Sequence, residues 1–140
     1  MIKYQENKGG SPPEEKNDCT VRALAIATNS TYTKAYMLLC QAGRKHNRGF
    51  VIEKLLKKNC SYLGHSFFKL PFRKPITIQK FVQKYPTGTY YVKIRGHVFV
   101  VREGTVIDMV EPRPMQRVTD AWQVTDNKKE GQRLKAAALV

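Results

Sequence analysis

Three residues of this sequence, Cys19, His97 and Asp108, have side chains that together could perform nucleophilic chemistry. A thiol attacks a carbonyl carbon well only as the thiolate, and a helix N-terminus lowers a thiol pKa because the helix dipole favours the anion. The attack also needs a base within hydrogen-bond reach, and a third group must hold that base in one tautomer. Cys19, His97 and Asp108 are candidates for these three roles.

A helix is predicted to begin at about Cys19, because the run CTVRALAIATN has apolar residues at helical spacing. Asn17 or Asp18 can accept hydrogen bonds from the first free N–H groups of this helix. The Cys19 backbone N–H could then donate to a tetrahedral oxyanion, and Asn17 is the nearest side-chain amide that could donate a second bond. One face of the helix is expected to be apolar at Val21, Leu24, Ala25 and Thr28.

An antiparallel meander is predicted over TGTYYVKIRGHVFVVREGTVIDMV, because three β-rich runs are separated by Arg95-Gly96 and by Glu103-Gly104. Alternation along the middle strand puts His97, Phe99 and Val101 on one face and Val98 and Val100 on the other. Both faces are apolar, so we expect this strand to be central. A turn at Glu103-Gly104 would pair Asp108 near the start of the His97 strand.

The remaining segments are predicted from periodicity and from turn residues. They comprise a short strand at Ile2 to Gln5, helices at Tyr32 to Lys45, Val51 to Lys58 and Ile78 to Lys84, and one strand within Ser61 to Leu70. We expect an irregular arm at 1–16, one α+β domain at 17–125, and a basic tail at 126–140. Beyond Pro112 and Pro114 the strand and helix signals weaken.

The composition is that of a globular protein, with 140 residues, 41% of them hydrophobic and 26% charged. No apolar run approaches the roughly 18 residues that span a bilayer, and the N-terminus has no apolar stretch typical of a signal peptide. The three cysteines are widely spaced with no CxxC pair, which fits a reducing cytoplasm better than a disulfide framework. Cys40 and Cys60 are expected to be small buried hydrophobes.

The sequence resembles papain-like cysteine peptidases, and within them the C39-like group, through DCTVRALAIAT followed by a helical region and GTYYVKIRGHVFVVREGTVID. It is also similar to small uncharacterised proteins, common in bacteriophages, with an NDC start and a GH-x-x-x-V-x-x-G-x-x-x-D end. The resemblance covers roughly residues 17–109. It implies a papain-like fold with N-terminal helices packed on an antiparallel β-sheet, with Cys19 as nucleophile, His97 as base and Asp108 as orienting residue.

One position departs from that family pattern. The oxyanion glutamine of the family usually stands about six residues before the cysteine, and here that position is Pro13. Either Asn17 substitutes for it, or the arm folds back to present Gln5, or the oxyanion hole is incomplete. We favour Asn17.

The chain is strongly basic, with 25 Lys and Arg against 11 Asp and Glu and a net charge of +14, so it is expected to attract polyanions. Two basic clusters are predicted at the surface, with aromatic neighbours that could stack on bases. The first cluster is Arg44, Lys45, Arg48, Lys54, Lys57 and Lys58, and the second is Lys69, Arg73 and Lys74 beside Phe67, Phe68 and Phe72. His46 and His65 lack partners at metal-ligand spacing, so neither a metal nor a cofactor is assigned.

The leading hypothesis is a thiol hydrolase, a cysteine peptidase, isopeptidase or amidase, that acts on a peptide or protein through an acyl-enzyme on Cys19. The first alternative is a non-catalytic binding protein on the same fold that contacts nucleic acid or a host protein. The second is an acyltransferase of transglutaminase-like type. We expect a cytoplasmic location, in the host cytoplasm if the protein is phage-encoded.

Overall fold

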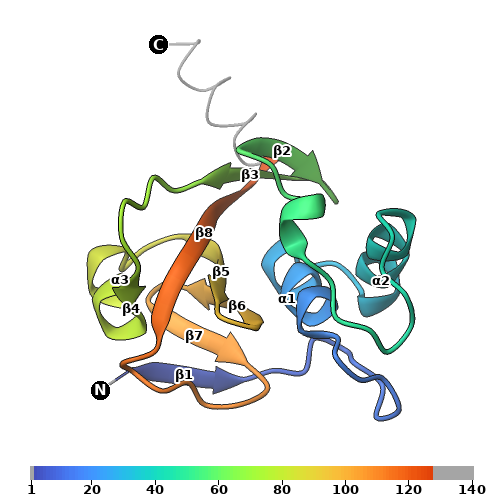
Figure 1. The fold of residues 1–140 in the computed structure, drawn as a ribbon, viewed down its shortest axis with the longest axis horizontal. Coiled ribbons are helices and arrows are strands. Elements are labelled where there is room, and N and C mark those ends of the chain that lie inside the picture. The colour runs from blue at the N-terminus through green and yellow to red at the C-terminus, as the bar shows by residue number, and fades with distance from the viewer. Residues whose placement is uncertain (1, 128–140) are drawn as a thin grey trace.

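A mixed β-sheet runs through the centre of the protein, which a computed structural model describes over residues 2–127. Within that range the fold is α+β, with eight strands, three α-helices and one 3₁₀ turn (Figure 1). The strands are β1 (Lys3–Glu6), β2 (Asn59–Tyr62), β3 (His65–Lys69), β4 (Ile76–Thr77), β5 (Thr89–Ile94), β6 (His97–Arg102), β7 (Thr105–Asp108) and β8 (Arg117–Asp126). The helices are α1 (Cys19–Thr28), α2 (Tyr32–Gln41) and α3 (Ile78–Lys84), with the 3₁₀ turn η1 at Ile52–Lys54.

The strand order is β1-β7-β6-β5-β8-β3-β2, with β4 paired to β8. All pairs are antiparallel except β1 with β7, which is parallel. The predicted meander is confirmed as β5, β6 and β7, joined by two-residue turns at Arg95-Gly96 and Glu103-Gly104. Glu103 and Gly104 both have positive φ, as the tight hairpin turn with the correct twist requires.

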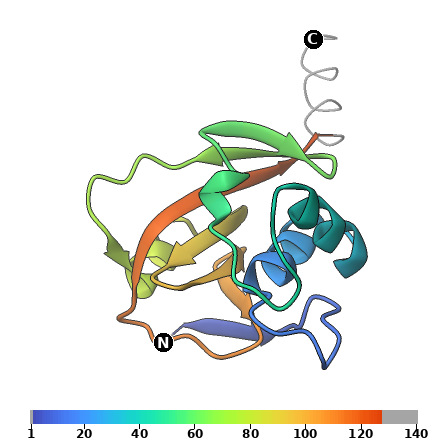
Figure 2. The same ribbon diagram turned by 45° about the vertical axis from the view of Figure 1, so that its right-hand side comes forward.

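The central strand β6 separates two hydrophobic cores, as its alternation predicts. Val98 and Val100 pack in the core that contains α1, and Phe99 and Val101 pack in the core that contains α3. The views in Figures 1 and 2 show α1 and α2 on one side of the sheet and α3 on the other. The start of β6 is therefore placed where the N-terminus of α1 can meet the sheet.

The helix predicted at Cys19 is confirmed as α1, and it is more buried than one apolar face would require. Every residue from Thr20 to Thr28 is buried, because the sheet covers one side of α1 and α2 covers another. Asn29 ends the helix in the left-handed conformation, and the N–H of Ser30 then reaches the Ala25 carbonyl at 3.0 Å. Such a helix holds Cys19 at a fixed place relative to the sheet.

Two helix predictions need correction. The second helix ends at Gln41 and not at Lys45, because Gly43 adopts a φ of 114° that interrupts it. The helix predicted at Val51 to Lys58 is wrong, since only the 3₁₀ turn η1 forms there. Ile52, Leu55 and Leu56 enter the core beside α1, and the extended strand β2 begins directly afterwards at Asn59.

The strand predicted within Ser61 to Leu70 is confirmed as β3, but its hairpin partner β2, which begins at Asn59, was not predicted. β2 and β3 pair around Leu63-Gly64, and both turn residues have positive φ. The longest strand, β8, was not predicted. It lies between β5 and β3 and buries Val118 and Ala121 toward one core but Trp122 and Val124 toward the other. A register shift opposite Lys93 and Ile94 interrupts its alternation.

The expected irregular arm contains the short strand β1, displaced by one residue from the predicted one. Lys3–Glu6 pairs with Thr105–Asp108, so the arm forms an edge of the sheet. The expected basic tail at 126–140 lies almost wholly outside the described residues, apart from the end of β8 and Asn127. No helix within residues 2–127 has the length and apolar character needed to cross a membrane.

Candidate active site

Cys19 is the first residue of α1 and is half-buried. Asp18 is the N-cap residue, and its carbonyl accepts the N–H of Arg22 at 2.9 Å. The N–H of Cys19 is therefore among the first helical N–H groups, which no carbonyl within the helix can reach. The thiol lies at the positive end of the helix, where a thiolate is favoured.

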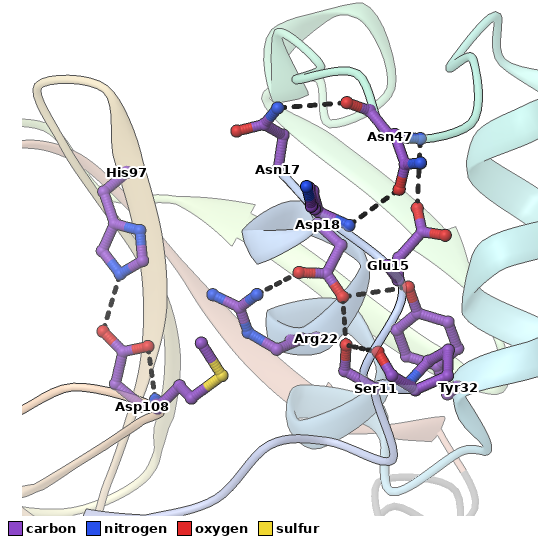
Figure 3. A network of polar contacts seen from close by, with 12 residues as sticks. Ser11, Glu15, Asn17, Asp18, Arg22, Tyr32, Asn47, His97 and Asp108 are labelled. Atoms are coloured by element: carbon purple, nitrogen blue, oxygen red, sulfur yellow. Dashed lines mark hydrogen bonds and ion pairs between the residues drawn. The ribbon is translucent and has the colours of Figure 1, made fainter.

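His97 and Asp108 are in direct contact. Nε2 of His97 lies 2.6 Å from Oδ2 of Asp108, and this carboxylate is buried (Figure 3). The β6–β7 register explains the contact, since Val100 pairs with Ile107 and the next step along each strand places Asp108 opposite Phe99. Asp108 and His97 are then diagonal neighbours on one face of the sheet.

Asp108 is itself fixed from several directions. Its Oδ1 accepts the N–H of Met109 at 2.7 Å. Its backbone carbonyl accepts the N–H of Asn7 at 2.8 Å and the hydroxyl of Tyr4 at 3.2 Å. Strand β1 of the arm thus supports the residue that orients His97.

The electrostatics of the site couple the thiol to the imidazole. The hydrogen bond with Asp108, and after it the hydrogen bond with Cys19, raises the pKa of His97 to about 9 although burial opposes this. Burial also acts to raise the pKa of the Cys19 thiol, but hydrogen bonds with His97 and the Val98 backbone and the charges of His97 and Arg22 outweigh it, so that pKa is lowered. Both shifts favour a proton on His97 and a thiolate at Cys19.

A pocket of about 280 Å³ opens onto the thiol. Cys19, Thr20 and His97 line it, together with an apolar wall from the segment before η1 and with strand residues; the other lining residues are Gly49, Phe50, Val51, Ile52, Lys93, Gly96 and Val98. At its edge, Nζ of Lys93 contacts both carboxylate oxygens of Glu53, at 2.6 and 2.9 Å. The Cys19 side chain thus lies at the wall of an open space.

Asn17 does not line this pocket, and neither does Gln5. The Asn17 side chain is exposed, and its Nδ2 donates to the carbonyl of Asn47 at 3.0 Å. Gln5 lies in β1 opposite Ile107. Thr20, which follows Cys19 in the sequence, does line the pocket, and its buried hydroxyl has no hydrogen-bond partner among residues 2–127.

The carboxylate of Asp18 does not cap α1, contrary to one of the two predicted caps. It is buried and accepts hydrogen bonds from the hydroxyls of Ser11 and Tyr32, the latter at 3.0 Å, and from Arg22. Arg22 therefore pairs with an acid inside the protein. This cluster ties the loop after β1 to both helices beside the nucleophile (Figure 3).

A second buried ion pair holds the segment just before Cys19. Nη2 of Arg44 lies 3.0 Å from Oε1 of Glu15 and also reaches the carbonyls of Lys16 and Asn17, at 3.4 and 3.3 Å. Asn47 adds a bond from its N–H to Glu15 and accepts the N–H of Lys16. Sequence reasoning missed this clamp, because its partners are about thirty residues apart and lie in loops.

Several surface predictions are corrected by the burial of individual residues. Arg44 is buried in the clamp and is not part of a basic surface cluster, and Phe67 is fully buried and cannot stack on a base. Cys40 is exposed, not buried, because the buried positions of α2 are Ala35 and Leu39. Cys60 is half-buried.

His46 and His65 also have partners in the structure. Nδ1 of His46 lies 2.8 Å from Oε2 of Glu15, and Nδ1 of His65 contacts the carbonyl of Leu63 at 2.9 Å. Within residues 2–127, no group of three or more His, Cys, Asp or Glu side chains is arranged to hold a metal ion.

Comparisons with known proteins give no match to a family model, to a curated protein or to a solved structure.

Proposed function

We propose that this protein is a thiol hydrolase that cleaves a peptide, isopeptide or other amide through an acyl-enzyme on Cys19. The observation that carries the proposal is the chain of contacts from Asp108 through His97 to Cys19, with the pKa of the thiol lowered and that of the imidazole raised. Buried structural cysteines lack this arrangement, because an apolar surrounding raises a thiol pKa. Cys60 shows that contrast, since burial raises its pKa.

The mechanism follows from which ring nitrogen is engaged. Nε2 of His97 donates to the carboxylate of Asp108, so Nδ1 is the nitrogen available to the thiol. The Cys19 thiolate attacks the carbonyl carbon, and the oxyanion that forms faces the N–H groups at the start of α1. The imidazolium then gives its Nδ1 proton to the leaving amine as the C–N bond breaks, leaving a thioester on Cys19.

Deacylation reverses the role of His97. The neutral imidazole takes a proton from water, the hydroxide attacks the thioester, and the acid product leaves as the Cys19 thiolate and imidazolium re-form. Asp108 stabilises the imidazolium in both half-reactions. The Thr20 hydroxyl is the one partnerless buried side-chain polar group among the described residues that line this pocket.

We further propose that the fold is papain-like and related to the C39-like group. Three features support this reading: a cysteine at the start of a helix buried against a sheet, a histidine at the start of a central antiparallel strand, and an aspartate at the end of the next strand. Their order along the chain and their contacts agree with the resemblance in sequence. The substrate we propose is accordingly a peptide or protein.

Selective alkylation tests the proposal. Iodoacetamide at about pH 6 should modify Cys19 much faster than Cys40, which is an exposed thiol in the same chain and serves as an internal standard. His97→Ala should slow labelling of Cys19 and leave that of Cys40 unchanged, as read by mass spectrometry of the peptides. Equal rates for both cysteines, or indifference of Cys19 to His97→Ala, would sink the catalytic assignment.

Turnover is tested with a peptide library derived from a proteome digest. Incubation with the protein should create new peptide termini, and Cys19→Ala should abolish them. Added hydroxylamine separates hydrolysis from acyl transfer, since a transferase would yield mainly the hydroxamate. Water as the main acceptor in the presence of amines supports the hydrolase.

A further inference from the structure

Exposed apolar side chains are concentrated around the candidate active site. Of the six large hydrophobic residues that are exposed among residues 2–127, Val51 lines the thiol pocket, and Met109, Val110 and Met115 lie in the loop between β7 and β8. That loop begins directly after Asp108. Exposed apolar groups in the thiol pocket and in the loop that follows Asp108 indicate a surface that binds another chain near the site.

A second hollow, of about 460 Å³, shares His97 with the thiol pocket. His97 and Asp108 line it but Cys19 does not, and the loop after β7 forms much of its wall. The charged and polar lining residues, besides His97 and Asp108, are Arg95, Glu111, Arg113 and Gln116. A smaller hollow of about 270 Å³ adjoins it, shares Arg95 and Gln116 with it, and adds Arg117.

The region around this hollow carries positive charges that are not paired with acidic side chains of the described residues. Arg95, Arg113 and Arg117 are exposed, and none has an ion pair within the described part of the chain. Glu111 contributes one carboxylate, and Asp108 is occupied by His97. By contrast, the buried arginines Arg22 and Arg44 are each paired with an acid.

We propose that this hollow, the arginine hollow, binds the leaving-group half of the substrate and selects an acidic side chain there. The proposal rests on the proposed function, because His97 must protonate the departing amine. The chain attached to that amine therefore extends past His97, away from the thiol, and the arginine hollow is the space it meets. Arg95 and Arg113 would bind the carboxylate, and the exposed apolar residues of the loop would contact its neighbours.

A polypeptide fits these groups better than a nucleic acid does. The hollow has no exposed aromatic ring on which a base could stack, since its one aromatic residue other than His97 is the buried Phe99. The apolar Met109, Val110 and Met115 suit amino-acid side chains. The arginines suit a carboxylate, whether it belongs to a side chain or to a C-terminus.

Cleavage profiling gives the first test. With the library described above, wild-type sites should be enriched in Asp or Glu within the first few residues after the cleaved bond. Arg95→Ala with Arg113→Ala should remove the enrichment while cleavage continues, and Lys58→Ala with Lys80→Ala, which deletes the same charge from exposed positions elsewhere, should preserve it. Cys19-dependent cleavage with no acidic preference would overturn the arginine hollow and leave the hydrolase standing.

Binding gives a test that needs no turnover. Cys19→Ala protein is titrated into a fluorescein-labelled, C-terminally amidated peptide that carries two Glu residues among Leu and Ala, and into its Gln analogue. The Glu peptide should bind about fivefold more tightly, and most of that preference should be lost with Arg95→Ala and Arg113→Ala but kept with Lys58→Ala and Lys80→Ala. If the peptides bind with this pattern but the wild-type protein cleaves no peptide, the hydrolase proposal would be contradicted and the assignment of the arginine hollow as a peptide-binding site would stand.

Two further arms identify the ligand. A free-acid Gln peptide that matches the Glu peptide in affinity would assign the hollow to a C-terminal carboxylate instead of a side chain. A single-stranded oligonucleotide that binds more tightly than the Glu peptide, with the same dependence on Arg95 and Arg113, would overturn the peptide assignment. Equal weakening by the arginine pair and the lysine pair would mean that net charge alone attracts acidic peptides, and the proposal would fail.

Discussion

Nε2 of His97 lies 2.6 Å from Oδ2 of Asp108, and Oδ1 of the same carboxylate accepts the N–H of Met109 at 2.7 Å. Both oxygens are therefore engaged, so the carboxylate cannot rotate without losing a bond. The hydrogen bond to this carboxylate also fixes the orientation of the imidazole, so that Nδ1 is the ring nitrogen available to Cys19. The pKa of the Cys19 thiol therefore depends, through His97, on Asp108 in the neighbouring strand.

Asp108→Asn is the substitution that tests this dependence. The amide keeps the size of the side chain and an oxygen for Met109, but it removes the hydrogen bond to a carboxylate that is the main reason for the raised pKa of His97, and with it the negative charge that adds to the shift. The pKa of His97 should fall, that of Cys19 should rise, and activity should drop on the order of 10²-fold. The pH dependence of Cys19 alkylation measures the shift, and a profile that matches the wild type would contradict the role given to Asp108.

Amide cleavage and alkylation should respond differently to high pH. Cleavage needs both the thiolate and the imidazolium, so it should rise through the lowered pKa of Cys19 and fall as the pH exceeds about 9, the pKa of His97. Alkylation needs only the thiolate and should stay high above pH 9. Both rates are measured over the same pH range. If alkylation also fell above pH 9, the assignment of the catalytic proton to His97 would be wrong.

The same pair makes a prediction about stability. A group whose pKa is raised on folding stabilises the fold below its ordinary pKa, here 6.5, and loses that stabilisation as the pH rises through the folded value. A lowered pKa, as for Cys19, acts in the opposite sense, with stabilisation present above the ordinary value of 9.0 and lost as the pH falls through the folded value. As the pH rises toward 9, His97 therefore loses stabilisation while Cys19 gains it, so the two effects oppose each other.

Cys19→Ala should therefore expose the contribution of His97. Asp108 still raises the pKa of His97 in this variant, so its free energy of unfolding should decline above pH 6.5, whereas Cys19 offsets part of that decline in the wild type. Urea unfolding at a series of pH values measures the difference. Adding His97→Ala to Cys19→Ala should remove the decline, and a decline that persists in the double variant would have another origin.

Local sequence patterns were sufficient to predict the elements that carry the site. The start of α1 at Cys19, the two turns that bound β6, and the pairing that brings Asp108 to His97 all depend on periodicity and on turns within a few residues of each group. Such features are set by short-range steric and hydrogen-bonding preferences. For that reason they can be inferred from one sequence.

Features that depend on distant contacts could not be predicted in the same way. Strand β8 loses its alternation at a register shift, so its buried residues do not follow a period of two. Only one 3₁₀ turn forms around Ile52, where helical spacing favoured a full helix, because its apolar residues fill the core beside α1. The pairing of Glu15 with Arg44 joins two loops that are about thirty residues apart in the sequence.

Glu15→Gln tests the clamp on the segment before Cys19. The substitution leaves the guanidinium of Arg44 buried without its counter-charge, so the free energy of unfolding should fall by about 3–5 kcal/mol. Under conditions where the protein is still folded, the reactivity of Cys19 toward iodoacetamide should also decrease. The reason is that Arg44 orients the carbonyls of Lys16 and Asn17, in the segment just before Cys19. Glu14→Gln, one residue earlier and exposed, should change the stability by no more than about 0.5 kcal/mol.

Two buried threonines of α1 offer a matched pair for the final prediction. The Thr20 hydroxyl has no partner within residues 2–127, whereas the Thr28 hydroxyl donates to the Leu24 carbonyl at 2.7 Å and lies 2.7 Å from Ser30 Oγ. Replacement of an unpaired buried hydroxyl by a methyl group removes a desolvation cost, so Thr20→Val should stabilise the protein by about 1 kcal/mol. Thr28→Val should destabilise it by a similar amount. Urea unfolding distinguishes the two signs, and a loss of stability in Thr20→Val would show that its hydroxyl is hydrogen-bonded in solution.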